Sequence, residues 1–230
     1  GLTFPLMGVS LHWFGNLFEN QAVGDFGGSL MRSFTLGLMV MVVTVIVSLL
    51  SGLSFRRHFF GSTVLFYLAI SSLVVPSIVV SLGIGVLYQQ LGLTSAWYSS
   101  AFGAHLTWTL PFGVLIMFAV FNRFSPAYEE AARDLGATPF QTFYHVVLPM
   151  ITPSLVGVGL FGFSLSYDEF ARSLMTSGSY NTLPLEIYGM TTNVTTPVLY
   201  ALGTVTTVIS LTIILIALAT ITLMRRRQTV

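Results

Sequence analysis

Sixty-four consecutive residues, from Phe59 to Asn122, carry no formal charge. A single helix of that length would extend about 96 Å, roughly three times the thickness of a bilayer's hydrocarbon core. The stretch must therefore fold back on itself. Only 7% of all residues are charged and the mean hydropathy is +0.84, so a soluble globule would have to expose most of its apolar surface. These features predict an all-α protein that crosses a membrane several times.

Apolar runs between the charged residues predict five spans. The run Phe34–Leu53 lies between Arg32 and Arg56 and is long enough for one crossing. The long uncharged stretch divides at the turn residues around Gly92 and Tyr98. The predicted spans are 34–53, 62–90, 101–121, 149–167 and 199–223. Five spans put the two ends of the sequence on opposite sides of the membrane, and we expect a sixth span upstream.

The basic residues, all nine of them arginine, orient these spans. If the spans alternate, most arginines fall on one side, which the positive-inside rule identifies as the cytoplasm. Residues 1–28 are then an external segment, and 29–230 are the transmembrane domain with a cytoplasmic loop at about 122–149. The arginines on the cytoplasmic side are Arg56, Arg57, Arg123, Arg133 and Arg225 to Arg227.

Composition excludes several other functions. A net charge of +1 gives no electrostatic reason to bind nucleic acid. The absence of cysteine excludes disulfides, thiolate catalysis and cysteine-based metal sites. The sequence has no GxxxxGK[ST] loop for nucleotide phosphates, so we do not expect the chain to hydrolyse ATP. The histidines are too dispersed to predict a metal site: His12, His58, His105 and His145.

The predicted cytoplasmic loop has strong local folding signals. Ser125 is a suitable N-cap and Pro126 a suitable first helical residue. Gly136 stands where a left-handed residue would end that helix. Thr138 and Gln141 predict a capping box that starts a second helix. The loop is expected to be two short helices joined at a glycine bend.

Pro149 marks the end of this loop and the entry to the next span. Within the first short helix, Glu129 can pair with Arg133, whereas Glu130 and Asp134 repel each other. An ordinary solvated loop tolerates such a layout. An acidic edge beside small side chains also suits docking into a basic groove of another protein, and the residues alone leave both interpretations open.

The loop resembles the EAA motif of ABC importer permeases. Glu130-Ala131-Ala132 is followed by three residues, Gly136, nine residues and Val146-x-Leu148-Pro149, with Val146 in place of the usual Ile. The order of spans also resembles a type I ABC importer permease over nearly the whole chain. In that family the loop is the coupling helix, which lies in a cleft of the ATPase subunit. The residues expected to dock are Glu129, Glu130, Ala131, Ala132, Asp134, Leu135 and Gly136.

The resemblance implies a set of partners in a bacterial inner membrane. Two ABC ATPase subunits would hold ATP and Mg, while this chain would bind no cofactor. A second permease subunit, identical or homologous, would complete the solute pathway, and an external solute-binding protein would deliver the solute. The alternative is a channel or secondary transporter without ATPase subunits, which should show paired acids or broken helices at mid-membrane.

Two further stretches resemble the polyamine/opine-type branch of the family, Ser164–Phe170 and Leu183–Tyr188. This implies a small polar or cationic solute such as a polyamine, although the branch also handles iron, thiamine, phosphonates and small amino-acid derivatives. Asp168 and Glu169, at the end of a span, are the candidate solute path because carboxylates at membrane depth are costly. The alternative is that they simply pair with Arg172.

Overall fold

The computed structural model describes residues 10–17, 24–57, 59–193 and 197–228. Within these ranges the chain forms helices and no strand, with one isolated antiparallel bridge between Ala96 and Gly178. The first half contains α1 (His12–Asn16), α2 (Phe26–Phe55), α3 (Ser62–Ser71), α4 (Ser77–Gln90), a π-helical turn (Trp97–Ala101) and α5 (Phe102–Arg123). The second half contains α6 (Ala127–Asp134), α7 (Pro139–Thr142), a second π-helical turn (Phe143–Val147), α8 (Leu148–Tyr167), α9 (Leu183–Asn193) and α10 (Val198–Gln228).

Three continuous helical segments of the described chain are long and apolar enough to cross a membrane. They are Phe26–Phe55, Trp97–Arg123 and Pro139–Tyr167, with 30, 27 and 29 residues. Each contains one of the predicted spans. The first π-helical turn extends α5, and the second joins α7 to α8. The all-α, membrane-spanning class predicted from the sequence is confirmed.

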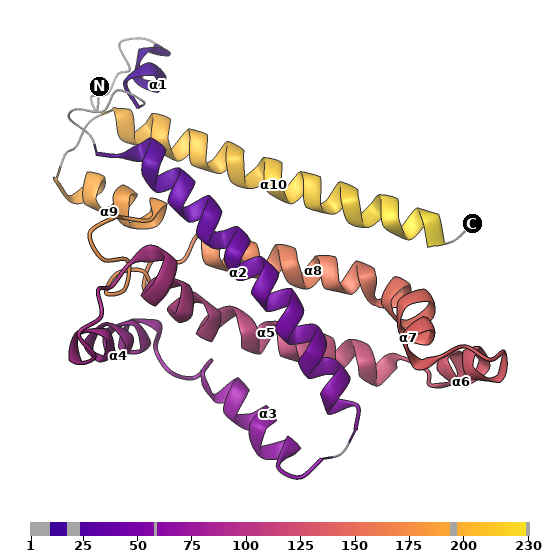
Figure 1. The fold of residues 1–230 in the computed structure, drawn as a ribbon. Coiled ribbons are helices and arrows are strands. Elements are labelled where there is room, and N and C mark those ends of the chain that lie inside the picture. Colours follow the sequence, from indigo (N-terminus) through magenta and orange to yellow (C-terminus); the bar gives the residue numbers. More distant parts are fainter. Residues whose placement is uncertain (1–9, 18–23, 58, 194–196, 229–230) are drawn as a thin grey trace.

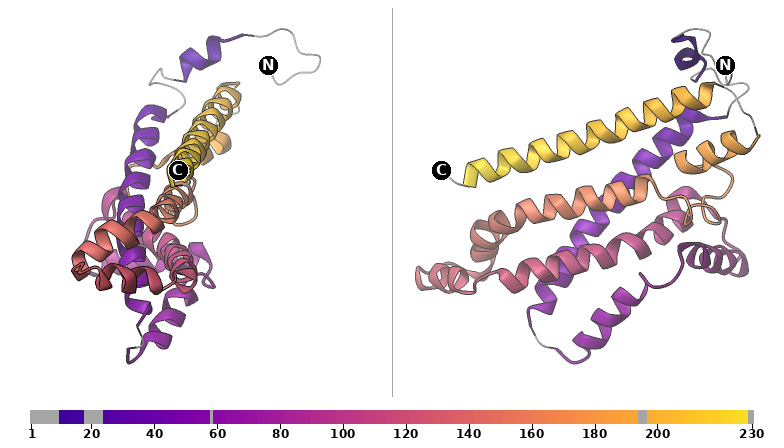
Figure 2. Two further views of the ribbon diagram at one scale, coloured as in Figure 1. Left: turned by 90° about the vertical axis from the view of Figure 1, so that its right-hand side faces the viewer. Right: turned by 180° about the vertical axis from the view of Figure 1, so that it is seen from behind.

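These three segments form the centre of the bundle. The helices α5 and α8 lie side by side, and α2 crosses both of them (Figures 1 and 2). Small residues allow the close approach: a Cβ at Gly52 would lie 2.9 Å from the Cβ of Met117. The hydroxyls of Thr44 on α2 and Thr109 on α5 hydrogen-bond at 2.9 Å. Such contacts are typical of helix packing in membranes, where apolar surface alone does not drive association.

The span predicted over 62–90 is divided into α3 and α4. The division falls just before Pro76, whose missing N–H and bulky ring disfavour a helix at that point. With 10 and 14 residues, the two helices are only about 15 Å and 21 Å long. The fifth predicted span lies within α10, which has 31 residues.

The loops gather at two opposite ends of the bundle. At one end, here called the loop end, lie α6, α7, the last turn of α2 and the C-terminal end of α10 (Figure 1). At the opposite end, here called the latch end, lie α1, α9 and the first turn of α2. Arginines 225–227 belong to the last turns of α10 and so lie at the loop end. Of the predicted external segment, residues 1–9 and 18–23 lie outside the described residues, as does His58.

Candidate functional site

The first helix of the loop, α6, begins one residue later than the sequence predicts. Its first intrahelical bond runs from the N–H of Glu130 to the carbonyl of Pro126 at 3.0 Å, so Pro126 occupies the cap position. The N-cap predicted at Ser125 is therefore wrong, and no side chain caps this helix. Ser125 contributes only its carbonyl, which accepts a long 3.4 Å turn bond from Tyr128.

The end of α6 has the predicted glycine turn. Gly136 has a φ of +86°, which is the left-handed conformation that residues with a Cβ rarely adopt. The N–H of Gly136 donates to the Arg133 carbonyl at 2.8 Å, and the N–H of Ala137 donates to the Ala132 carbonyl at 3.0 Å. This pair of bonds is a Schellman motif, and it turns the chain sharply back from the helix.

The capping box predicted after the turn is confirmed. The N–H of Thr138 donates to the side-chain oxygen of Gln141 at 2.8 Å, and the N–H of Gln141 donates to the Thr138 hydroxyl at 3.3 Å. From Pro139 the chain then stays helical to Tyr167. Pro149 lies in the first turn of α8, directly after the π-helical turn. The residue expected to mark the entry to the span therefore lies at a joint between two parts of one long helical segment.

One ion pair ties α6 to the end of α2. The guanidinium of Arg56 donates to both carboxylate oxygens of Glu129, at 2.7 Å and 3.0 Å. Both side chains are largely buried, and the guanidinium also lies over the rings of Phe121 and Phe124, 5.2 Å and 5.4 Å from their centroids. Glu129 thus pairs with Arg56 across the bundle instead of with Arg133 on its own helix, and it points away from the exposed side of α6.

The remaining residues expected to dock stay on the surface of the loop. Glu130, Ala131 and Asp134 are exposed, Ala132 is half-buried, and the side chain of Leu135 is 89% exposed. Sequence reasoning missed two aromatic residues on the following helix, Phe140 and Tyr144. Their rings stack with centroids 6.2 Å apart, and Phe140 is 75% exposed. Their spacing of four residues on a polar loop was the signal that could have found them.

At the latch end, the two stretches that resemble the polyamine branch line one pocket. The pocket has a volume of about 590 Å³ between the end of α8, α9 and α10. Asp168 is its only carboxylate among the lining residues, and partial burial raises the pKa of this carboxyl above its ordinary value. Its aromatic lining consists of Tyr167, Phe170 and Tyr188. A carboxylate beside aromatic faces can bind an organic cation.

Glu169 and Arg172 are not among the residues that line this pocket. One oxygen of Glu169 accepts the backbone N–H of Arg172 at 3.0 Å, but the guanidinium of Arg172 forms no ion pair with the described residues. The Arg172 side chain is fully buried, where it donates to the Thr107 hydroxyl and lies 5.1 Å from the ring centroid of Trp108. The suggested pairing of Asp168 and Glu169 with this guanidinium is therefore not found.

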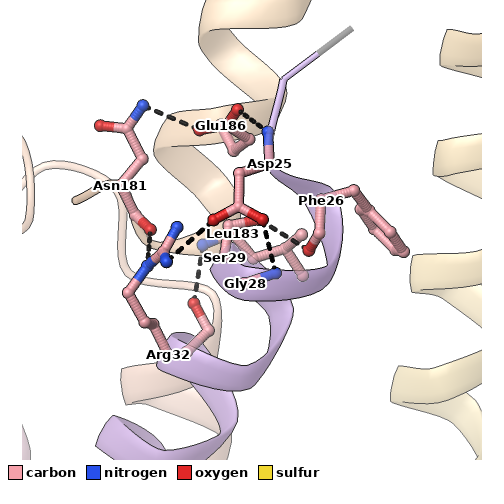
Figure 3. Close-up of polar contacts among 9 residues, drawn as sticks. Asp25, Phe26, Gly28, Ser29, Arg32, Asn181, Leu183 and Glu186 are labelled. Carbon is pink, nitrogen blue, oxygen red and sulfur yellow. Dashed lines mark hydrogen bonds and ion pairs between the residues drawn. The ribbon is translucent and has the colours of Figure 1, made fainter. Parts of the chain in front are cut away.

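A second polar cluster at the latch end went unpredicted (Figure 3). Arg32 on α2 forms an ion pair with Asp25 at 3.0 Å, and its Nε donates to the carbonyl of Asn181 at 2.7 Å. Glu186 on α9 accepts the backbone N–H of Asp25 and the side-chain amide of Asn181, both at 2.8 Å. We call these four residues the latch. They join the start of α2 to the segment that leads into α9.

One histidine has a structural role where the start of α5 meets the end of α8. His105 is buried, and its two ring nitrogens lie 2.8 Å and 2.9 Å from the hydroxyls of Ser166 and Ser173. Both ring nitrogens of this buried histidine therefore have hydrogen-bonding partners. Within the described ranges, no group of three or more His, Asp or Glu side chains is arranged to hold a metal ion.

The bundle of apolar helices, with a structured polar loop at one end, defines the chain as a polytopic α-helical membrane protein. Residues 44–229 match the model of the family described as binding-protein-dependent transport system inner membrane component, and the chain belongs to this family. It is therefore a multi-pass inner-membrane permease subunit of an ABC importer.

Curated relatives are similar over most of the chain. The spermidine/putrescine transport system permease protein PotC of Haemophilus influenzae is 28% identical over 212 residues, covering 91% of this chain and 81% of the relative. PotC of Escherichia coli K12 is 29% identical over 214 residues, covering 90% and 78%. The putrescine transport system permease protein PotI of the same strain is 26% identical over 205 residues, covering 86% and 72%.

A solved structure supports the fold. An inward-facing structure of the MetNI methionine ABC transporter matches with a TM-score of 0.64 and 16% identity, covering 86% of this chain and 94% of the other. At that identity the similarity concerns the fold alone. It agrees with the type I permease architecture that the order of spans predicted.

Proposed function

We propose that this permease couples ATP hydrolysis on two partner ATPase subunits to the import of a small organic cation of the polyamine type. An external solute-binding protein would deliver the cation, and a second permease, identical or homologous, would complete the pathway. ATP and Mg would be held by the ATPase subunits, and this chain would bind no cofactor. The loop end would face the cytoplasm, as the arginine bias indicates.

The observation that carries the coupling part is the exposed face of α6. Glu130, Ala131, Asp134 and Leu135 are presented on a helix whose position is set by the Arg56–Glu129 ion pair. Glu130 and Asp134 repel each other at four residues' spacing, so a helix selected only for its own stability would avoid the pair. An exposed leucine beside two carboxylates suits a partner cleft that is apolar at its centre and basic at its rim.

The test of coupling replaces Glu130 with Ala and Gly136 with Val. The first removes a docking carboxylate, and the second forces a β-branched residue into a left-handed conformation. Both variants should insert in the membrane but lose ATPase binding or solute uptake. Gly136→Asn should keep function because asparagine tolerates that conformation. Gly157→Ala, at a helical glycine with open space around its Cβ, is the control. Full ATPase binding and uptake in both loop variants would refute the assignment.

The cation part is supported by the pocket around Asp168 and by the names of the relatives. PotC is described as a permease of spermidine and putrescine transport, and PotI as one of putrescine transport. Both solutes are polyamines, whose ammonium groups would match the Asp168 carboxylate and the aromatic faces of Tyr167, Phe170 and Tyr188. Glu169 does not line this pocket, although the sequence made it an equal candidate.

The test separates the two acids. Asp168→Asn should reduce uptake of labelled putrescine or spermidine while ATPase assembly stays intact, because a neutral amide cannot balance an ammonium charge. Glu169→Gln should have a smaller effect. Equal uptake by wild type and Asp168→Asn would exclude this pocket from the path. Uptake that persists in vesicles without ATP would instead favour the channel or secondary transporter.

A further inference from the structure

A second pocket lies at the loop end, between the last turn of α2 and the helices α6 and α7. Its volume is about 520 Å³, within the range of ligand-binding pockets. One wall comes from the end of α2 and the two residues after it, and is formed by Leu50, Leu53, Ser54, Arg56 and Arg57. The opposite wall is formed by Glu129, Arg133, Pro139, Thr142, Phe143 and Val147.

The pocket has an excess of positive charge. Three arginines and one glutamate line it, and the glutamate is fully engaged by Arg56 through two hydrogen bonds. The side chains of Arg57 and Arg133 are exposed, and neither forms an ion pair or a side-chain hydrogen bond with any described residue. Two unengaged guanidiniums therefore line one cavity, one from the segment directly after α2 and one from α6. The planar fork of arginine matches the oxygens of a phosphate group.

The surroundings of the pocket are those of a membrane surface. Phe59 and Phe60 follow Arg57 closely, and Phe60 is fully exposed. An apolar stripe on α2 leads away from the pocket along the length of the bundle. It begins at Leu50, which is 58% exposed, and continues with Ile46 and Val42. A phosphate held by the arginines would thus stand at the foot of an apolar surface long enough to contact an acyl chain.

We propose that this pocket binds the phosphate group of an anionic phospholipid at the cytoplasmic surface and that the bound phosphate bridges Arg57 and Arg133. Basic pockets at the cytoplasmic side of membrane helices attract anionic headgroups in this way. The bridge links the end of α2 to α6 beside the Arg56–Glu129 pair. An anionic lipid would therefore stabilise the loop in its docking position and raise the efficiency of coupling. The site rests on the proposed cytoplasmic orientation of the loop end.

The binding test uses the purified permease–ATPase complex in nanodiscs. Phosphatidylglycerol in a phosphatidylcholine background is compared with phosphatidylcholine alone and with phosphatidylcholine plus inorganic phosphate. Native mass spectrometry should detect phosphatidylglycerol retained by the wild-type complex. The double variant Arg57→Gln/Arg133→Gln should retain it about thirtyfold less tightly, since each arginine contributes to headgroup attraction. Arg123→Gln removes an exposed arginine at the same end that does not line the pocket, and should retain the lipid.

Each outcome of this test decides the proposal. Loss of phosphatidylglycerol in the double variant but not in Arg123→Gln supports it, as does higher coupled uptake with phosphatidylglycerol in the wild type alone. Competition by inorganic phosphate without lipid retention would show a free-phosphate site and overturn the lipid source. Equal loss in the double variant and in Arg123→Gln would show general charge attraction only and would overturn the proposal. Crosslinking of positions 57 and 133 to carboxylates of a partner subunit would show that the pocket binds that protein, and the lipid proposal would fail. Lipid retention does not require transport, so its failure is distinguishable from failure of the proposed function.

Discussion

At the latch end, four polar residues join the first two turns of α2 to α9 and the segment before it, whereas at the loop end a single arginine joins the last turn of α2 to α6. The latch distributes its bonds over Asp25, Arg32, Asn181 and Glu186 (Figure 3). The loop end depends on the two hydrogen bonds between Arg56 and Glu129. The polar link from α2 is thus redundant at the latch end, whereas its polar link to α6 at the loop end is a single ion pair.

This difference indicates how the two ends respond to force. Losing one bond of the latch leaves others that hold α9 against α2. Losing the Arg56–Glu129 pair leaves α6 held by its chain connections, by its packing on α7 and the second π-helical turn, and by the packing of Phe124 and Tyr128, whose ring centroids are 6.0 Å apart. An element tied at one point can tilt as a unit, and such an element suits the transmission of movement from a partner.

The largest expected effect concerns which side of the membrane each end faces. The chain has no cysteine, so single cysteines can be introduced at Arg123 and at Ser179, two exposed positions at the loop and latch ends. A membrane-impermeant maleimide added to intact cells should label position 179 and not 123. Both should react after permeabilisation. External labelling at 123 would reverse the orientation, and the docking proposal would fail with it.

The next effect is expected from Arg56→Ala. Loss of a charged hydrogen-bonding partner for the largely buried Glu129 should weaken the attachment of α6 by about 2 kcal/mol. Amide hydrogen exchange within 127–134 should become faster by about thirtyfold, and uptake should fall relative to ATP hydrolysis. Exchange of the two charges, Arg56→Glu with Glu129→Arg, should restore part of the protection. Arg123→Ala is the control, and unchanged exchange in Arg56→Ala would show that the ion pair is not the tether.

A smaller effect is expected from Arg32→Gln in the latch. The carboxylate of Asp25 is more than half exposed, and exposed ion pairs contribute less than about 1 kcal/mol. The bonds from Glu186 to Asp25 and to Asn181 would remain. Exchange within α9 should therefore rise by no more than about fivefold. A rise larger than that produced by Arg56→Ala at the loop end would contradict the redundancy of the latch.

The smallest effect is the pH dependence of the latch. The backbone N–H of Gly28, aided by Arg32 and opposed by burial, holds the pKa of Asp25 below its ordinary value of 3.8. A carboxyl whose pKa is lowered on folding stabilises the fold fully above its unfolded value. That contribution is lost as the pH falls through the lower folded-state pKa. Exchange within α9, corrected for intrinsic rates, should rise only below about pH 4. Asp25→Asn should abolish this dependence, and a transition near neutral pH would indicate another group.

Local signals explain what the sequence could predict at the loop. The Gly136 turn and the Thr138–Gln141 capping box each depend on residues within five positions of one another. Such motifs form from backbone geometry and nearby side chains, so their residue types are visible in the sequence. The error at Ser125 has a local cause as well, because Pro126 takes the cap position itself and leaves the serine outside the helix.

Long-range pairings could not be predicted in this way. Arg56 and Glu129 are 73 residues apart, and Asp25 and Glu186 are 161 apart. Which charges meet depends on how α2 crosses α5 and α8, and that crossing is set by close contacts at small residues such as Gly52 and Gly113. The division at Pro76 was visible as an interruption, but a proline alone does not determine whether a helix bends or stops.

The helical segment from Pro139 to Tyr167 has a mechanical consequence. Its straight part, α8, has 20 residues and is about 30 Å long, with the π-helical turn at one end and Asp168 at the other. A tilt of only about 5° around the end at Leu148 would displace the opposite end by about 3 Å, which is comparable to the distance between an ammonium nitrogen and the groups that bind it. A lever of this kind converts a small rotation at one membrane surface into the opening or closing of a passage at the other.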